Sequence, residues 1–317
     1  MGLLTPNVLW ADSVTVTDKL GRTVHVPLPV ERAALVATEE IIPALDLWDR
    51  VVGVSKWAQE GCDVVKAWVT RSPHLRKPAV GQGMDVNVEA VLSVRPQLVV
   101  TWAVFPSSVR FLEERGIPTI AIQPDSIEEL RDTIRLHGKL FGKEKRADEV
   151  LAEMDRVFAM VESRLPQVFG TDRPTVLVTW MRPTSVNGKQ GMMQEIVSRL
   201  RGRNPAENMD VRVVDVPSER IFEWLPQVIF TWGYAGYGPE WFLERPQWHA
   251  VPAVRNGRVH RLPTWSTASP RAALIALFMA MRIHPKAFAD VDFEAEVDAF
   301  YRKVFGISLQ EVKTHAP

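Results

Sequence analysis

The chain has 317 residues, of which 46% are hydrophobic and 24% charged, so it can bury one or two cores and is neither disordered nor fibrous. Its 38 Lys and Arg balance 38 Asp and Glu, which excludes a general attraction to nucleic acid or to an anionic membrane. The single cysteine, Cys62, excludes an intrachain disulfide and any metal site built from several cysteines, and the seven histidines lack metal-ligand spacing.

The first half of the chain predicts short strands that alternate with helices. The alternating pattern over Val14–Val26, interrupted at Gly21, predicts a β-hairpin. After it come an apolar run, Ala33–Ala37, and expected strands at Val51–Val54, Leu98–Trp102 and Thr119–Ile122. Helices are expected at Glu39–Trp48, Val88–Val94 and Ser107–Arg115. This alternation is typical of parallel sheets wound in βα units.

A long helical tract divides the chain. It begins at Ser126, breaks near Gly142, resumes over Lys145–Leu165 and ends before Pro166. The alternation then restarts, with strands expected at Thr175–Trp180, Arg212–Val214 and Val228–Trp232, and helices at Met193–Leu200, Ile221–Trp224, Pro270–Arg282 and Phe293–Phe305. We therefore predict an α/β protein with two Rossmann-like lobes, residues 1–144 and 167–317, whose parallel-rich sheets are joined by a single long helix over 145–166. A ligand cleft is expected between the lobes.

Two segments 130 residues apart repeat the same pattern, VEAVLSVRPQLVVTW over Val88–Trp102 and SERIFEWLPQVIFTW over Ser218–Trp232. The identical positions are Glu89/Glu219, Pro96/Pro226, Gln97/Gln227, Thr101/Thr231 and Trp102/Trp232. Each copy predicts a short helix, a proline that stops it, and a buried strand that ends in tryptophan. Two unrelated βα units could share this pattern. The alternative is two similar lobes, each with a tryptophan at the carboxyl end of a strand, where open α/β sheets bind ligands.

Enzyme signatures are missing: the sequence has no GxSxG, Walker or GxGxxG motif, so we expect no catalytic residue, bound metal or cofactor. Aromatic and basic residues instead follow the predicted strands, and any one of them could equally belong to a core or to a surface ion pair. The candidate ligand-binding residues are Trp57, Trp102, Trp180, Arg182, Trp232, Tyr234, Tyr237, Trp265 and Arg271. Aromatic faces with two guanidinium groups suit a bulky ligand that carries negative oxygens.

Several short motifs occur in a particular order along nearly the whole chain: Pro29–Arg32, Asn87–Glu89, Arg95–Val100, Gly116–Pro118, Pro217–Glu219, Arg255–Val259 and Ser269–Arg271. In order and spacing they resemble the solute-binding proteins of ABC importers for ferric siderophores, heme and cobalamin. The family usually has Asp at the positions of Gln97 and Gln227, and no axial His or Tyr for heme stands out here.

The resemblance implies binding without catalysis, by a monomer located in the periplasm or tethered outside the membrane, although the given chain shows no signal sequence. It implies a partner, the permease dimer of an ABC importer, docked through Glu89 and Glu219. A ferric siderophore is the ligand we expect first. A corrinoid such as cobalamin and a molybdate-type oxyanion stay open, as does a sensor subunit that binds the same ligand. A chelatase or nitrogenase-like two-lobed metalloenzyme is the alternative from another class, and it would need cysteine ligands or a catalytic histidine.

Overall fold

A computed structural model describes residues 13–167 and 172–315. The chain forms two compact units, each with a sheet of its own. The first comprises residues 13–123, 134–147 and 314–315, and the second comprises residues 124–133, 148–167 and 172–313. The division falls inside two helices, α6 (Ile127–Phe141) and α7 (Glu144–Arg164). The predicted α/β class with two sheet-bearing lobes is confirmed.

The sheet of the first unit has four parallel strands. Their order is β4 (Val51–Val54), β3 (Ala33–Leu35), β5 (Leu98–Trp102) and β6 (Thr119–Ile122). The strands are almost wholly buried, as near-continuous apolar runs predict for parallel sheets. The helices of this unit, besides parts of α6 and α7, are α1 (Ile41–Leu45), α2 (Lys56–Glu60), α3 (Asp63–Arg71), α4 (Val88–Ser93) and α5 (Pro106–Glu113).

One predicted helix is much shorter than expected. The pattern over Glu39–Trp48 predicted a continuous helix, but α1 covers only Ile41–Leu45 because Asp46 adopts a left-handed conformation with φ 53°. Thr38, at the other end of this segment, also has φ 53°. Two helices that the sequence analysis did not predict, α2 and α3, follow β4.

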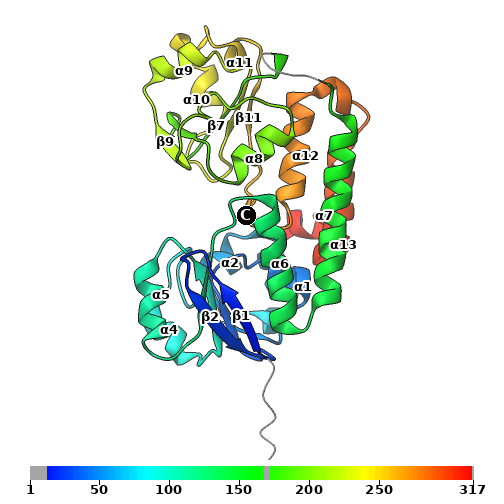
Figure 1. Ribbon diagram of the computed structural model, residues 1–317. Helices are drawn as coiled ribbons and strands as arrows, with labels where there is room; N and C mark the ends of the chain where they lie inside the picture. Colours follow the sequence, from blue (N-terminus) through cyan, green and yellow to red (C-terminus); the bar gives the residue numbers. More distant parts are fainter. Residues whose placement is uncertain (1–12, 168–171, 316–317) are drawn as a thin grey trace, which may run out of the picture. The chain divides into compact units, whose positions relative to one another are not determined.

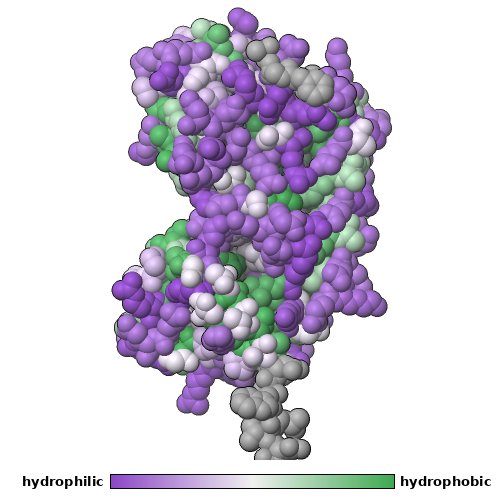
Figure 2. All heavy atoms as spheres, viewed as in Figure 1, coloured by the Kyte–Doolittle hydropathy of each residue, from purple (hydrophilic) through white to green (hydrophobic). Residues whose placement is uncertain are grey.

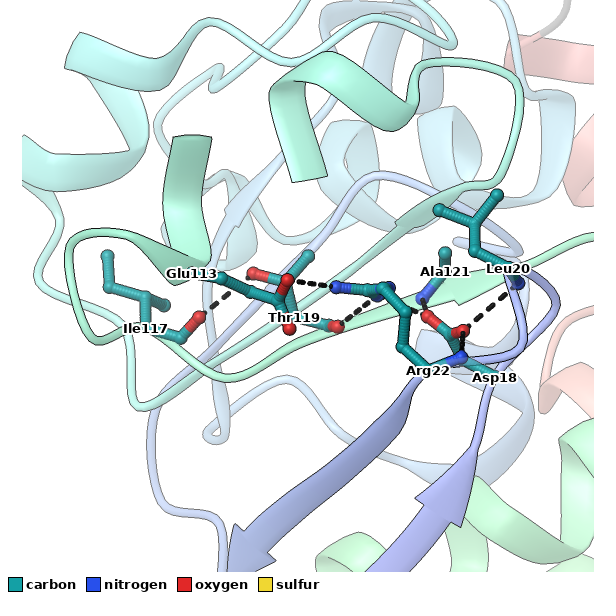
Figure 3. A network of polar contacts seen from close by, with 7 residues as sticks. All are labelled: Asp18, Leu20, Arg22, Glu113, Ile117, Thr119 and Ala121. Atoms are coloured by element: carbon teal, nitrogen blue, oxygen red, sulfur yellow. Dashed lines mark hydrogen bonds and ion pairs between the residues drawn. The ribbon is translucent and has the colours of Figure 1, made fainter. Parts of the chain in front are cut away.

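The predicted hairpin is present as β1 (Ser13–Thr17) and β2 (Thr23–Pro27), with Gly21 in the turn at φ 74°. Its turn is tied to β6 by a buried network (Figure 3). Asp18 Oδ1 accepts hydrogen bonds from the backbone N–H groups of Leu20 and Arg22, each at 3.0 Å, and Oδ2 accepts from Ala121 N–H at 3.1 Å. Arg22 forms an ion pair with Asp18 and donates to the carbonyl oxygen of Thr119. The network therefore anchors the hairpin to the edge of the sheet.

The sheet of the second unit is mixed. Its order is β11 (Val259–Arg261), β10 (Val228–Thr231), β7 (Val176–Thr179), β8 (Ser185–Asn187) and β9 (Val213–Asp215). The first three strands are parallel, and β8 pairs antiparallel with both of its neighbours. The further helices are α8 (Met192–Arg199), α9 (Ser218–Trp224), α10 (Glu240–Leu243), α11 (Pro252–Arg255), α12 (Ala272–Ile283), α13 (Phe293–Phe305) and α14 (Leu309–His315). Leu177, Ile229, Phe242 and Trp248 lie at the centre of its core.

The long helices begin and break as predicted. Ser126 Oγ accepts the N–H of Glu129 at 3.1 Å and so caps the start of α6. Gly142, at φ 65°, ends α6, and the N–H of Lys143 donates to Gly138 at 2.7 Å. Figure 1 shows α7 beside α13, and Glu153 of α7 binds Lys303 of α13 at 2.6 Å.

The sequence repeat is also a structural repeat. Each helix ends in a left-handed residue before the proline, Arg95 at φ 47° and Leu225 at φ 46°. Gln97 Oε1 then accepts the N–H groups of Glu31 and Arg32, which lead into β3, at 2.8 and 3.0 Å. Gln227 Oε1 accepts the N–H of Thr175, which leads into β7, at 2.9 Å. Each glutamine thus ties the start of its own strand to the start of a neighbouring strand through its side-chain amide oxygen.

Candidate functional site

The structure brings two predicted tryptophans together at the carboxyl ends of adjacent strands in the second unit. Trp180 directly follows β7 and Trp232 directly follows β10, and these strands are parallel neighbours. The backbone N–H of Trp232 donates to Thr179 at 2.9 Å, and the two indole rings lie 4.3 Å apart between centroids at 47°. Adjacent parallel strands that end in tryptophan therefore build an aromatic pair at the sheet edge that open α/β proteins use for ligands.

The indole Nε1 of Trp180 is buried and has no hydrogen-bond acceptor among the described residues. A buried N–H without an acceptor lowers stability by roughly 1–3 kcal/mol, so proteins seldom keep one without reason. The ring itself is half-buried, whereas Trp232 is only 7% exposed. The pair can offer the exposed part of the Trp180 ring to a ligand, and Nε1 can donate to a ligand oxygen once the groups that cover it move.

Two predicted tyrosines adjoin the pair through the loop after β10. The ring of Tyr234 lies 5.9 Å from that of Trp232, and its hydroxyl donates to the carbonyl oxygen of Thr264 at 2.7 Å. The hydroxyl of Tyr237 lies 2.8 Å from both Thr179 Oγ1 and the carbonyl oxygen of Trp180. Burial raises the pKa of Tyr237 to about 12, so the phenol stays protonated. These contacts hold the loop against the ends of β7 and β10.

Arg182 lies in the turn between β7 and β8 and is exposed. It forms an ion pair with Asp215 at the end of β9, and both side chains are more than half exposed. An exposed pair of this kind contributes little to stability, so the guanidinium can exchange Asp215 for another anion at small cost.

Trp265 and Arg271 lie together in the interior. Trp265 is 8% exposed and stacks on Phe293, with ring centroids 6.3 Å apart. Arg271 is fully buried, donates to the hydroxyl of Tyr301 at 2.9 Å, and lies 5.3 Å from the centroid of the Trp265 ring. Their surroundings are aromatic side chains of the second unit, so the structure places both in packing contacts.

In the first unit, Trp102 is the last residue of β5 and is half-buried, and Trp57 is the second residue of α2. Near the start of α2 lies a group that the sequence analysis missed: the hydroxyl of Ser55 donates to Glu39 Oε1 at 2.6 Å. Burial raises the pKa of Glu39 to about 7, and the bond from Ser55 acts against that rise. Two consecutive glutamates within the apolar run LVATEEII were the available signal.

Glu89 and Glu219 occupy equivalent places, each the second residue of its helix and each exposed. Neither carboxylate forms an ion pair within the described part of the chain. Because α4 and α9 lead into β5 and β10 through short connections, their first turns face the carboxyl edges of the two sheets. The first unit also exposes Leu92 on α4 and Phe105 and Phe111 at α5, and Figure 2 shows apolar residues on the surface of this unit.

The described residues, 13–167 and 172–315, contain neither a metal-binding cluster nor a membrane-spanning helix. Within those ranges, no group of three or more His, Cys, Asp or Glu side chains is placed to hold a metal ion. None of the helices in the same ranges has the length and apolarity that a membrane crossing requires.

Known proteins resemble this chain over most of its length. The family model described as periplasmic binding protein matches residues 36–264. The molybdate-binding protein MolA of Haemophilus influenzae is 26% identical over 93% of this chain and 92% of its own length, and the iron(3+)-hydroxamate-binding protein FhuD of Bacillus subtilis is 22% identical over 57% of this chain and 59% of its own. The solved structure of CeuE from Helicobacter pylori, in complex with nickel and histidine, has a TM-score of 0.82 and 28% identity, and covers 96% of this chain and all of that one.

Proposed function

Since this chain belongs to the periplasmic binding protein family, the substrate-binding proteins of ABC importers, we propose that it captures a metal chelate outside the cytoplasm, a ferric siderophore first of all, and delivers it to a permease. The observation that carries the proposal is the pair of Trp180 and Trp232 at the carboxyl ends of β7 and β10, with rings 4.3 Å apart. Flat aromatic faces bind bulky, delocalised ligands, and the indole N–H of Trp180, which has no acceptor among the described residues, can serve a chelate oxygen once the groups that cover it move.

The other proposed ligand contacts differ in how readily each side chain can reach a ligand. Tyr234 adjoins Trp232 and can extend the aromatic surface. Arg182 is exposed, so it can turn from Asp215 to an anionic oxygen of the chelate. Tyr237 holds the site through its hydrogen bond to the carbonyl oxygen of Trp180. Trp265, which is 8% exposed, and the fully buried Arg271 can contact a ligand only after local rearrangement. Trp57 and Trp102 remain proposed contacts from the first unit.

A molybdate-type oxyanion is the second candidate ligand. Its support is the similarity to MolA over nearly the full length of both chains. An oxyanion is held by N–H donors and guanidinium groups and gains little from stacking. Loss of an aromatic ring from the tryptophan pair should therefore weaken chelate binding more than oxyanion binding. A corrinoid is a third candidate ligand, and the same binding experiment would detect it.

Tryptophan emission tests the proposed site. A ferric hydroxamate chelate should quench the wild-type emission saturably. Trp180→Phe and Trp232→Phe each leave a smaller aromatic ring and remove an indole N–H. We expect both to reduce the quench, and Trp180→Phe to weaken binding by about 1–2 kcal/mol. Trp224→Phe, at the last residue of α9, where the chain leads into the amino end of β10, is the matched control and should bind like the wild type. Equal binding by all variants would remove the pair from the ligand site.

Transport tests the proposed docking residues. We expect Glu89→Arg and Glu219→Arg each to lower uptake into vesicles that contain the cognate permease, and the double variant to abolish it, because interfacial charges govern encounter and register. Ligand affinity should stay unchanged, since both side chains are exposed on the surface. Glu223→Arg, on the same helix as Glu219, is the control. Normal uptake by the double variant would mean that the two acids serve only as helix-start residues.

A further inference from the structure

Basic side chains gather at the amino edge of the second sheet, opposite the tryptophan pair. Strands β7, β10 and β11 are parallel, so the segments that lead into them lie at the same edge. Arg258 leads into β11, and its Nη2 donates to the carbonyl oxygens of Arg282 and Ile283 at 2.6 and 3.0 Å. His284 Nε2 lies 2.8 Å from the carbonyl oxygen of Leu200. We define Arg258, His260, Arg282 and His284 as the basic cluster.

The arginines of the second unit fall into two groups, those that pair with a carboxylate and those, such as Arg245 and Arg261, that donate to backbone carbonyl oxygens. Arg164 pairs with Asp290 at 2.7 Å and Arg199 pairs with Glu162 at 2.7 Å. Arg258 and Arg282, in contrast, donate to backbone carbonyl oxygens, and within the described part of the chain no carboxylate pairs with either of them. The basic cluster therefore places two guanidinium groups at this edge with no paired carboxylate among the described residues.

Burial, together with nearby arginines in the case of the two histidines, disfavours positive charge in the basic cluster. Burial lowers the pKa of Arg282 to about 10. Burial also lowers the pKa of His260 to about 4, with further lowering by Arg282 and Arg258. The pKa of His284 is lowered by burial and, more weakly, by Arg258 and Arg201. Each group is thus held where its own positive charge is disfavoured, and a bound anion would relieve this.

The end of α12 explains part of the arrangement. The partial negative charge of a helix C-terminus, about half an elementary charge, favours the contacts that Arg258 makes with its last carbonyl oxygens. Those contacts use Nη2 alone, and a guanidinium has five N–H donors. The fixed Nη2 therefore holds the remaining donors of Arg258 in a defined orientation.

We propose that the basic cluster is an anion site that binds a phosphate group through the guanidinium groups of Arg258 and Arg282. Guanidinium forks match the oxygen geometry of phosphate, and a guanidinium that is already fixed loses little freedom on binding. Free inorganic phosphate and a phospholipid headgroup present the same chemistry. The site lies at the opposite edge of the sheet from Trp180 and Trp232, so it is independent of the proposed chelate site.

Histidine NMR and calorimetry test the anion site in the full chain. Inorganic phosphate, added at constant ionic strength against chloride, should raise the pKa of both His260 and His284, whose ring signals are assigned through His260→Gln and His284→Gln. We expect Arg282→Gln to weaken phosphate binding about tenfold, the equivalent of one charge-assisted hydrogen bond. Arg220→Gln, which removes the same charge from exposed α9, should bind like the wild type.

A second variant and a second probe complete the design. Arg258→Lys keeps the charge and a donor for the α12 carbonyl oxygens, so the variant should fold. It loses the guanidinium fork, so its affinity for phosphate should be lower than that of the wild type. Vesicles of phosphatidylglycerol, with phosphatidylcholine as control, identify a headgroup as the source. Histidine shifts with phosphate, or cosedimentation with phosphatidylglycerol that Arg282→Gln reduces, would support the site. The proposal would be overturned if phosphate left the pKa of both histidines unchanged and the protein did not bind the vesicles. It would also be overturned if Arg220→Gln lost as much phosphate affinity as Arg282→Gln.

Discussion

The hydroxyl of Ser55 donates a 2.6 Å hydrogen bond to Glu39 Oε1, and the same oxygen of Ser55 accepts the N–H of Ala58 at 3.0 Å. One serine therefore caps the first turn of α2 and satisfies a buried carboxyl group. Because α2 carries Trp57, Glu39 is linked through Ser55 to a proposed ligand contact of the first unit.

Glu39 should make the stability of the protein depend on pH. Its pKa rises from 4.5 to about 7 on folding, so its contribution is fully present below pH 4.5 and is lost as the pH rises through 7. We expect the wild type to lose about 2.5 kcal/mol of stability through Glu39 between pH 5 and pH 8, and Glu39→Gln, which keeps an acceptor for Ser55, to lack this loss. Urea unfolding at both pH values measures this. Glu60→Gln, on the exposed face of α2, is the control, and an unchanged pH slope in Glu39→Gln would contradict the assignment.

Asp18 should be essential for attaching the hairpin. Its side chain is fully buried, and it accepts three backbone N–H groups as well as Arg22 (Figure 3). We expect Asp18→Ala to lower the free energy of unfolding by on the order of 3 kcal/mol, because it leaves those donors without an acceptor. Glu223→Ala, which breaks the exposed pair with Arg220, should change stability by only about 0.5 kcal/mol. A loss for Asp18→Ala no larger than that control would show that the network is dispensable.

The two repeat glutamines should differ in importance. Gln97 accepts two backbone N–H groups and Gln227 accepts one, so Gln97→Ala should cost more than Gln227→Ala, about 2 kcal/mol against about 1 kcal/mol. Gln97→Glu keeps the acceptor and should recover most of the loss. Thermal unfolding of the three variants would reveal the order, and equal costs for both alanine variants would argue against the hydrogen bonds as the cause.

Sequence patterns predicted those features that depend on neighbours along the chain. The repeat and the tryptophans at the strand ends follow from strand periodicity. The adjacency of Trp180 and Trp232 was not predicted, because it depends on the pairing of β7 with β10. The environment of Arg182 could not be predicted in this way, because its partner Asp215 joins it only through the antiparallel strands β8 and β9. The burial of Arg271 depends on Tyr301 of α13, a contact between helices that no local pattern encodes.

The helix predicted over Glu39–Trp48 was too long for a related reason. Its residues have helical periodicity, but Thr38 and Asp46 both adopt positive φ, and such conformations are uncommon for residues other than glycine. Burial of Glu39 and Glu40 within the same segment shows that tertiary packing overrides the local preference here.

Native mass spectrometry of the folded wild-type chain with a panel of ligands tests the central claim most directly. The panel contains a ferric hydroxamate chelate, its iron-free form, cobalamin and molybdate, each in excess over the protein. We predict a one-to-one complex with the ferric chelate that survives competition by the iron-free form and weakens in Trp180→Phe. A protein that stays folded and forms no complex with any member of the panel would contradict the account.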